Sequence, residues 1–596
     1  MKRLDWVLGL ALGTAVAAAC SATGGGRPGA SGGPDASATG GGGGSHAGAS
    51  GGGQAGLASA GTSGAAPGSG GTPGSGGGLG GWGGAAGGAG SGGIDDGGVT
   101  DANEDALIGD GGTTIVIGTG ADASTPGKFS GPIDPGASPT VVYPETGVLI
   151  PPNMNSLEFH FIPAPGQTLF QFSFHAPTQN LEVYVGCTPL GAGCVFTPDQ
   201  TFWKELVAYA RGTAPVSWTL RGVDGAGKVG ASAEQTMIFS KNDIIGGIYY
   251  WNTRGVIQRY DFGNPGKAAE QYLTPASGGA AICVGCHALS RDGRYIAIGK
   301  DIPSPAPYTV FNVANKTVHS AGGKPFNGQS NFFSFSPDSA YLLFSGGINV
   351  QQRDLATGAL ASGMVAKPGT MPDWSPDGTL LVYAKPKTAP FAPQPGVSSA
   401  SLELLSYGGG SSWTNPKTLV PFTGQNSYYP AFSPDSQWVV FNRSPGNHES
   451  YSNSRPDSDA GTVPDGELWA VSRSGGALIQ LAHATRSKWS SWPKWAPNVQ
   501  TYYDGTVMWL TFSSSRAYGL RLADGAKTQL WMVGFDPAKA AAGKDPSFAA
   551  FWLPFQDITG GNHIAQWVTR VLRQPCKAAA DCPGTDFCRG GYCFGI

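Results

Sequence analysis

The chain contains one complete C-x-x-C-H motif, formed by Cys283, Cys286 and His287. Two thiols at this spacing can add to the two vinyl groups of one haem, and the adjoining imidazole can then bind the iron. The same residues can instead form a disulfide or a reactive dithiol beside an unrelated histidine. The motif therefore predicts a covalent haem c site with His287 as the iron ligand, and a structural Cys283–Cys286 disulfide is the alternative.

The first 20 residues have the pattern of an export signal. A basic start is followed by an apolar run from Trp6 to Ala19, which is too short to cross a bilayer. The small residues before Cys20 resemble the lipobox of bacterial lipoproteins, in which the cysteine becomes the acylated N-terminus. Ser21, rather than aspartate, then implies sorting to the outer membrane. We expect Cys20 to be the lipid anchor of an outer-membrane lipoprotein facing the periplasm or the cell surface.

The six other cysteines fit an oxidising compartment. Cys187 and Cys194 bracket a short loop and are expected to bond to each other. The last four lie close together near the C-terminus, where the sequence leaves three connectivities open: Cys576, Cys582, Cys588 and Cys593. Residues 574–596 are therefore predicted to form a small disulfide-stapled tail, because so short a segment cannot build a core otherwise.

The charge balance argues against polyanionic partners. The chain has 37 basic and 40 acidic residues, and only 13% of its residues are charged. Such a chain has no field that would attract nucleic acid or an anionic membrane surface. We expect a monomer that contacts the membrane only through its lipid and meets a redox or envelope protein partner.

Composition and periodicity divide the rest of the chain. Residues 21–130 are dominated by Gly, Ala and Ser, which predicts a disordered tether. In residues 139–243, short runs alternate between apolar and polar side chains, as in Leu157–Phe161 and Phe170–Phe174. This pattern predicts an antiparallel β-sandwich that resembles immunoglobulin and fibronectin-III modules.

Residues 244–573 contain a repeated strand-turn unit. An aromatic residue, Ser-Pro-Asp and a small residue precede an apolar strand at Phe335–Ser339, Trp374–Gly378 and Phe432–Ser436. A variant stands at Leu289–Gly293, and Trp495–Asn498 is a degraded copy. These repeats resemble those of TolB-like β-propellers, in which Pro and Asp form a tight turn between the first two strands of a blade. The resemblance implies an all-β fold with six blades.

Aligned on the repeats, six residues occupy equivalent places on the predicted inner strands and should meet at one channel mouth: Cys286, Phe332, Met371, Tyr429, Trp492 and Ile564. The last blade should be closed by Gly247–Trp251 and Val256–Tyr260 joining the strand that contains Trp567. A haem at this mouth would find large aromatic walls. Met371 and His563 are the candidates for the sixth iron ligand.

No catalytic constellation stands out, so we do not expect an enzyme. The sequence favours an envelope lipoprotein that carries one haem c for electron transfer or ligand sensing. The alternative is a propeller scaffold that binds a protein or a glycan without catalysis.

Overall fold

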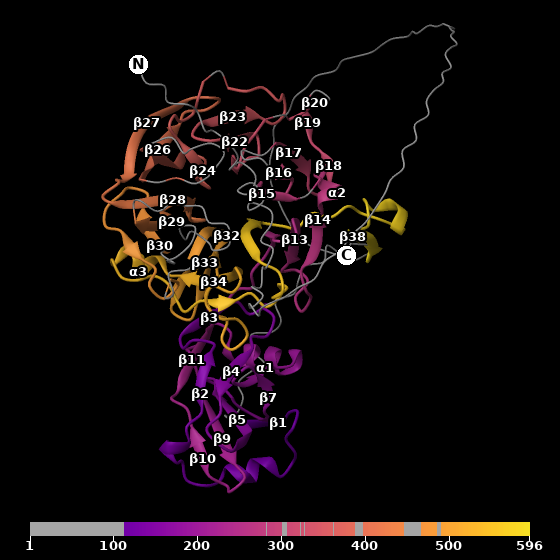
Figure 1. The fold of residues 1–596 in the computed structure, drawn as a ribbon, viewed down its shortest axis with the longest axis vertical. Helices are drawn as coiled ribbons and strands as arrows, with labels where there is room; N and C mark the ends of the chain where they lie inside the picture. Colours follow the sequence, from indigo (N-terminus) through magenta and orange to yellow (C-terminus); the bar gives the residue numbers. More distant parts are fainter. Residues whose placement is uncertain are drawn as a thin grey trace, which may run out of the picture. The chain divides into compact units, whose positions relative to one another are not determined.

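The computed structural model describes residues 112–281, 283–300, 307–321, 324–326, 328–361, 363–387, 397, 399–445, 466–485 and 490–595. The lipobox and Cys20 lie outside these residues. The described chain is almost entirely β-structure (Figure 1). Its α-helices are short: α1 (Gln200–Ala210), α2 (Pro275–Gly278) and α3 (Pro537–Ala541). None of the described helices has the length and apolar character that crossing a bilayer requires.

Two sheets come from the first part of the described chain. The first has the order β1-β6-β5-β9-β11-β3, with β10 added to β9, and the second has the order β2-β4-β8-β7. Their bounds are β1 (Thr113–Ile117), β2 (Thr140–Tyr143), β3 (Val148–Ile150), β4 (Phe159–Ile162), β5 (Gln167–His175), β6 (Asn180–Gly186), β7 (Thr188–Leu190), β8 (Gly193–Phe196), β9 (Val216–Asp224), β10 (Val229–Ala231) and β11 (Gln235–Phe239). Phe159 and Phe161 of β4 pack against Phe170 and Phe172 of β5, so the inward residues of both sheets share one core.

Two expectations about this region are wrong. Residues 113–117 form β1, an edge strand that pairs in parallel with β6, so the predicted tether cannot extend to residue 130. All five residues of β1 are β-branched, which favours a strand despite the glycine-rich neighbourhood. The sheet is also not wholly antiparallel, because β11 pairs with β3 in parallel.

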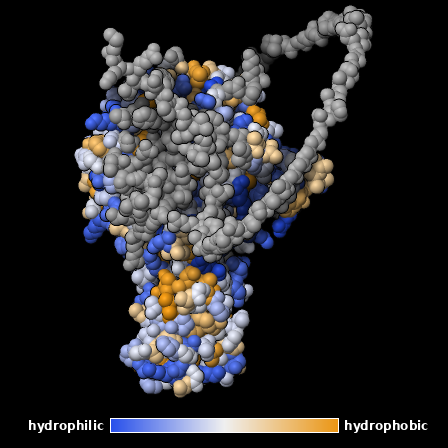
Figure 2. All heavy atoms as spheres, in the orientation of Figure 1, coloured by the Kyte–Doolittle hydropathy of each residue, from blue (hydrophilic) through white to orange (hydrophobic). Residues whose placement is uncertain are grey.

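The face of the sandwich seen in Figure 2 carries both hydrophilic residues and apolar patches. Ile115 and Ile117 of β1 are among the exposed large aliphatic side chains of the sandwich.

Six antiparallel sheets follow in the described residues, and contacts between their first strands join them into a ring (Figure 1). In order, they are β36 (Asn562–Val568) with β12 (Gly247–Asn252), β13 (Val256–Asp261) and β14 (Glu270–Leu273); β15 (Val284–Leu289), β16 (Tyr295–Lys300), β17 (Tyr308–Asn312) and β18 (Thr317–Val318); β21 (Phe332–Phe335), β22 (Tyr341–Ser345) and β23 (Val350–Asp354); β24 (Thr370–Trp374), β25 (Leu380–Pro386), β26 (Ala400–Tyr407) and β27 (Trp413–Val420); β28 (Gln425–Phe432), β29 (Trp438–Pro445), β30 (Glu467–Ser472) and β31 (Ile479–Gln480); and β32 (Ser490–Tyr502), β33 (Gly505–Ser514), β34 (Gln529–Phe535) and β35 (Phe551–Trp552). A small ribbon of β19 (Ser320–Ala321) and β20 (Lys324–Pro325) lies between two of the sheets in sequence.

The region is a β-propeller. The blade of β36, β12, β13 and β14, the first in the order above, is closed as the sequence predicts, because β36 pairs with β12 through Trp567 and Ile248.

The repeated turns share one hydrogen-bond pattern. In the turn after β21, the Ser336 hydroxyl donates to Asp338 at 2.6 Å and accepts from the Tyr341 amide at 2.9 Å. In all four turns the residue after the aspartate has a left-handed backbone. Two of the turns have a serine at this position, Ser339 and Ser436, and the other two have a glycine. The degraded copy at Trp495–Asn498 forms no such turn, because β32 runs through it to Tyr502. That copy lacks the Ser and Asp side chains that hold the other turns.

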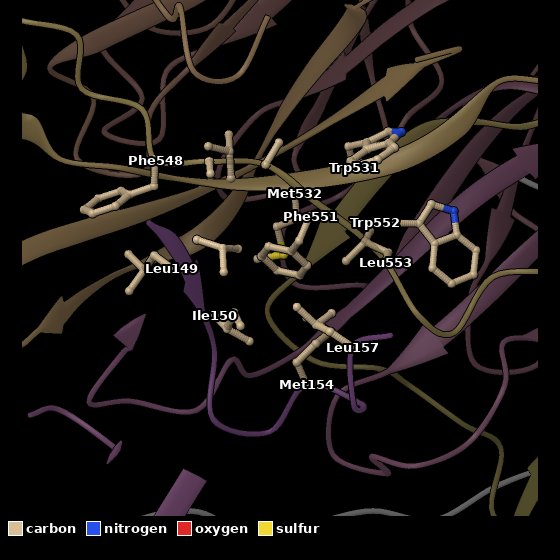
Figure 3. Packing of buried hydrophobic residues seen from close by; sticks show 14 of the residues in the cluster. Leu149, Ile150, Met154, Leu157, Trp531, Met532, Phe548, Phe551, Trp552 and Leu553 are labelled. Carbon is tan, nitrogen blue, oxygen red and sulfur yellow. The ribbon is translucent and has the colours of Figure 1, made fainter. Parts of the chain in front are cut away.

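The sandwich and the propeller share a core. Leu149, Ile150 and Leu157 pack with Met532 and Phe551 of the last blade (Figure 3). A polar cluster lies beside this core, where the Glu158 carboxylate accepts hydrogen bonds from Tyr518 at 3.0 Å and from Arg521 Nε at 2.5 Å.

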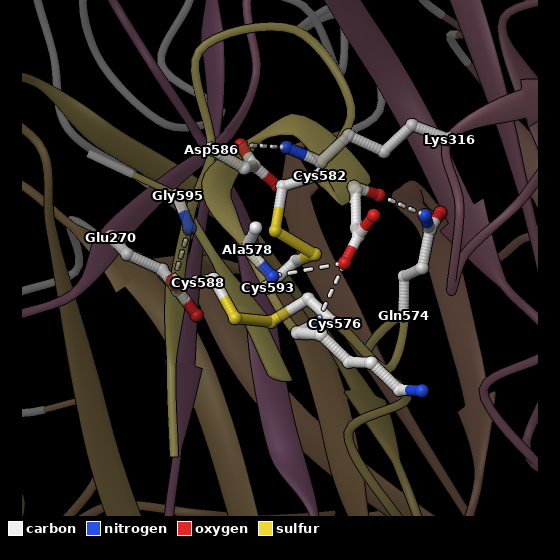
Figure 4. The surroundings of a disulfide bond; sticks show 12 residues. Glu270, Lys316, Gln574, Cys576, Ala578, Cys582, Asp586, Cys588, Cys593 and Gly595 are labelled. Carbon is white, nitrogen blue, oxygen red and sulfur yellow. Dashed lines mark hydrogen bonds and ion pairs between the residues drawn. A yellow bond between two sulfur atoms is a disulfide. The ribbon is translucent and has the colours of Figure 1, made fainter. Parts of the chain in front are cut away.

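The tail is stapled by the disulfides Cys576–Cys588 and Cys582–Cys593, and Cys187 is bonded to Cys194. The tail includes the hairpin of β37 (Phe587–Arg589) and β38 (Tyr592–Phe594). It is fixed to the propeller by an ion pair between Lys316 and Asp586, 2.6 Å apart, and by a hydrogen bond from the Gly595 amide to Glu270 of β14 (Figure 4). The disulfide-rich tail is thus confirmed, with one of the three connectivities.

Candidate functional site

The six residues predicted to be equivalent line one cavity on the propeller axis. Each comes from the innermost strand of a different blade: Cys286 on β15, Phe332 on β21, Met371 on β24, Tyr429 on β28, Trp492 on β32 and Ile564 on β36. The cavity has a volume of about 30 Å³. A space of this size holds one or two water-sized bodies.

The backbone at this ring is strained in a regular way. Five of the six residues have φ between 42° and 54°, a region that side chains with a Cβ rarely adopt, and Phe332 is the exception. Around all five, including Cys286 and Ile564, the strand pairing shifts register. Bulges of this kind re-aim a side chain, and repeated strain of this kind is typical of functional positions.

Aromatic rings from three blades lie close together at the mouth. Tyr429 and Trp492 stack with their centroids 3.8 Å apart, and Phe332 lies 5.8 Å from Trp492 on the opposite side of the ring. Side chains from blades that are far apart in sequence therefore meet on the axis.

Cys286 and His287 lie side by side on this cavity. Cys286 is a free cysteine and is therefore not bonded to Cys283. Its surroundings desolvate the thiolate and raise the pKa of the thiol to about 11. His287 is buried, and its Nε2 donates to the backbone carbonyl of Tyr249 at 3.2 Å, while its Nδ1 has no hydrogen-bond partner. Burial, helped by the charge of Lys494, lowers the pKa of His287 to about 4, although the hydrogen bond to Tyr249 acts in the opposite direction.

The two candidates for a sixth ligand lie in different surroundings. Met371 is buried and lines the cavity. His563 does not line it but packs beside Trp492, with ring centroids 5.9 Å apart. Burial lowers the pKa of His563 to about 3, and its Nδ1 is buried without a partner.

The placed side chains do not fit a porphyrin. Cys283 is buried and is not among the lining residues, and His287 Nε2 is used by a backbone carbonyl. Ligand sites for molecules of cofactor size measure roughly 300–1,000 Å³. A haem would need Phe332 and Trp492 to leave the axis. Covalent haem therefore stays a prediction from the motif, and this geometry does not support it.

Sequence reasoning missed the polar part of the lining. Lys494 and Gln566 line the cavity two places after Trp492 and Ile564, and Lys494 lies 3.7 Å from Asp373, the corresponding residue of β24. The sequence could have indicated both residues. Lys494 and Gln566 each lie two residues after a residue of the predicted ring, and alternate residues of a strand share a face.

Comparisons with known proteins support no functional assignment. No family model matches the chain, and no curated protein matches it. Solved structures do show likeness. A putative TolB from Agrobacterium tumefaciens is 15% identical, with a TM-score of 0.26 over 48% of this chain and 89% of that one.

Two further structures are similar to a comparable degree. The β-propeller domain of the trilobed protease from Pyrococcus furiosus is 11% identical, with a TM-score of 0.25 over 54% of this chain and 80% of that one. The GH74 enzyme of Niastella koreensis is 11% identical, with a TM-score of 0.29 over 50% and 42%. These scores carry no argument about function, and the propeller rests on the strand pairing itself.

Proposed function

We propose that the protein is a binding protein of the cell envelope whose ligand site is the axial mouth of the propeller. The single observation that supports this most is the ring of six blade-equivalent residues, from Cys286 to Ile564, which line one axial cavity and of which five have a strained backbone. The three disulfides of the described residues fit an oxidising compartment, as the export signal also predicts.

A protein partner is favoured over a glycan. Sugars are held by exposed aromatic faces, but Tyr429 and Trp492 cover each other's faces in a stack 3.8 Å apart. A tyrosine and a tryptophan next to Met371 form the kind of anchor that dominates protein interfaces. The small opening suits a single projecting side chain of an envelope protein.

The proposal is tested by placing a photo-crosslinking residue at Trp492 and, as a matched control, at Tyr503, which is 55% exposed. We expect an envelope protein to be crosslinked from position 492 and not from position 503. With that partner purified, Trp492→Ala should weaken binding by at least about 30-fold, the effect of a 2 kcal/mol anchor.

The control Tyr503→Ala should leave the affinity unchanged, and thermal unfolding of both variants shows whether they are folded. The absence of any crosslink from position 492, or equal binding by both variants, would overturn the proposal. Crosslinking to glycan in place of protein would favour the other class of ligand.

A further inference from the structure

The cavity at the propeller axis combines soft donor atoms. Cys286 contributes a free thiol, Met371 a buried thioether and His287 an imidazole. All three residues line the same space of about 30 Å³, a volume suited to one ion.

The histidine is held in the form that a metal ligand needs. Its Nε2 donates to the Tyr249 carbonyl at 3.2 Å, so the hydrogen is on Nε2 and the lone pair is on Nδ1. That Nδ1 is buried, with His287 only 3% exposed, and it has no hydrogen-bond partner. Histidines that bind metals commonly donate their other ring N–H to a backbone carbonyl, which fixes the ring in this way.

The charges of the site select the ion. Among the described residues no carboxylate lines the cavity, and Lys494, which does line it, has its ammonium group 3.7 Å from the Asp373 carboxylate. When a monovalent cation displaces the thiol proton of Cys286, the thiolate and the cation together are neutral. With Lys494 balanced by Asp373, a divalent cation on the thiolate would still leave the site with one net positive charge, which burial makes costly. Thiolate and thioether ligands also favour Cu(I) over harder ions.

We propose that Cys286, Met371 and His287 form a binding site for a soft monovalent cation of the Cu(I) class. The site lies in the mouth that is proposed to bind a partner, so this inference builds on the proposed function and adds a ligand to it. Binding releases the thiol proton of Cys286 and involves no change of oxidation state.

The test uses the full mature chain with its disulfides intact. Ag(I), a soft monovalent probe that needs no reductant, is titrated by calorimetry, and Cu(I) is then measured under anaerobic conditions against a chromogenic chelator. We expect one ion per chain. Cys286→Ser should weaken binding by at least about 100-fold and Met371→Leu by about 10-fold or more, since even outer-shell changes at metal sites cost 10- to 100-fold.

The matched control is Met364→Leu, which changes an exposed methionine outside the cavity and should bind as the wild type does. Thermal unfolding confirms that each variant is folded, and X-ray absorption at the copper edge, which should show sulfur and nitrogen neighbours, gives a second readout. Unchanged affinity in Cys286→Ser, or no stoichiometric binding by the wild type, overturns the inference. Because crosslinking from position 492 is measured without metal, loss of the cation site and loss of the partner site are told apart.

Discussion

Ser339 and Ser436 allow the hydrogen bonds of the repeated turns to be tested separately from backbone strain. Their φ angles, 58° and 61°, are nearly the same, and both side chains are buried. The Ser436 hydroxyl accepts a hydrogen bond from the Asp377 amide at 3.0 Å. The Ser339 hydroxyl has no partner in the described part of the chain. Replacing each with glycine changes the backbone in the same way but the hydrogen bonding differently.

The magnitudes follow from these contacts. Glycine relieves the left-handed strain, which costs about 1–2 kcal/mol, but it also loses roughly 0.5–1 kcal/mol of backbone entropy. In Ser339→Gly the unpaired buried hydroxyl also disappears, so we expect a gain of about 1 kcal/mol. In Ser436→Gly a bond worth about 0.5–1.5 kcal/mol is broken and the Asp377 amide is left unpaired, so we expect a loss of about 1 kcal/mol.

Thermal unfolding measures the difference between the two variants. For a propeller of roughly 320 residues, the unfolding entropy is about 0.7 kcal/mol per kelvin, so a difference of about 2 kcal/mol separates the Tm values by about 3 °C. The relief of left-handed strain and the entropy cost of glycine are the same in both variants, because the φ angles of the two serines match, so these two effects cancel in the comparison. If Ser436→Gly raises Tm as much as Ser339→Gly does, the hydroxyl–amide bond between the blades contributes nothing and the reasoning is wrong. A lower Tm for Ser339→Gly would refute the argument from strain.

Two further predictions concern ion pairs. The side chains of Asp586 and Lys316 are only 6% and 9% exposed, so Asp586→Asn leaves the Lys316 ammonium group buried without its partner. The substitution should weaken the attachment of the tail by about 3–5 kcal/mol. Hydrogen exchange of the tail should then speed up at least about 100-fold. Asp557→Asn, which breaks an exposed pair worth less than about 1 kcal/mol, is the control, and equal exchange in both variants would contradict the prediction. Burial of Glu158 opposes ionisation, but hydrogen bonds from His160, Arg521 and Tyr518 lower its pKa to about 2. The ionised carboxylate of Glu158 therefore contributes roughly 2–3 kcal/mol to the free energy of unfolding above about pH 4.5, and this contribution is lost as the pH falls toward 2. In Glu158→Gln the Tm should fall less steeply in acid than in the wild type. Parallel Tm curves for the two proteins would rule this out.

The sequence predicted the propeller well because its signal is repeated. The turns after Phe335, Trp374 and Phe432 use Ser and Asp side chains to bond their own backbone, so each is specified locally. The alignment of these turns also placed Cys286 and Trp492 on one cavity. Equivalent positions of a cyclic repeat have to converge, and this follows without knowledge of any contact.

The rest could not be read in this way. The size of the cavity depends on how Tyr429, Trp492 and Phe332 pack against one another across blades, which no local pattern encodes. A C-x-x-C-H motif predicts haem only where both thiols can face one space. Strand β1 was missed because five β-branched residues follow a long glycine-rich tract, whose composition dominated the prediction.

The pairing of β12 with β36 also determines when the ring can form. About 310 residues separate the two strands, so the first blade lacks its inner strand until nearly the whole chain has been made. Until then, Ile248 and its neighbours on β12 present an uncovered strand edge that other chains could join. Any protein that ends before β36 should therefore behave as an aggregation-prone fragment, even though five of its six sheets have complete sequences.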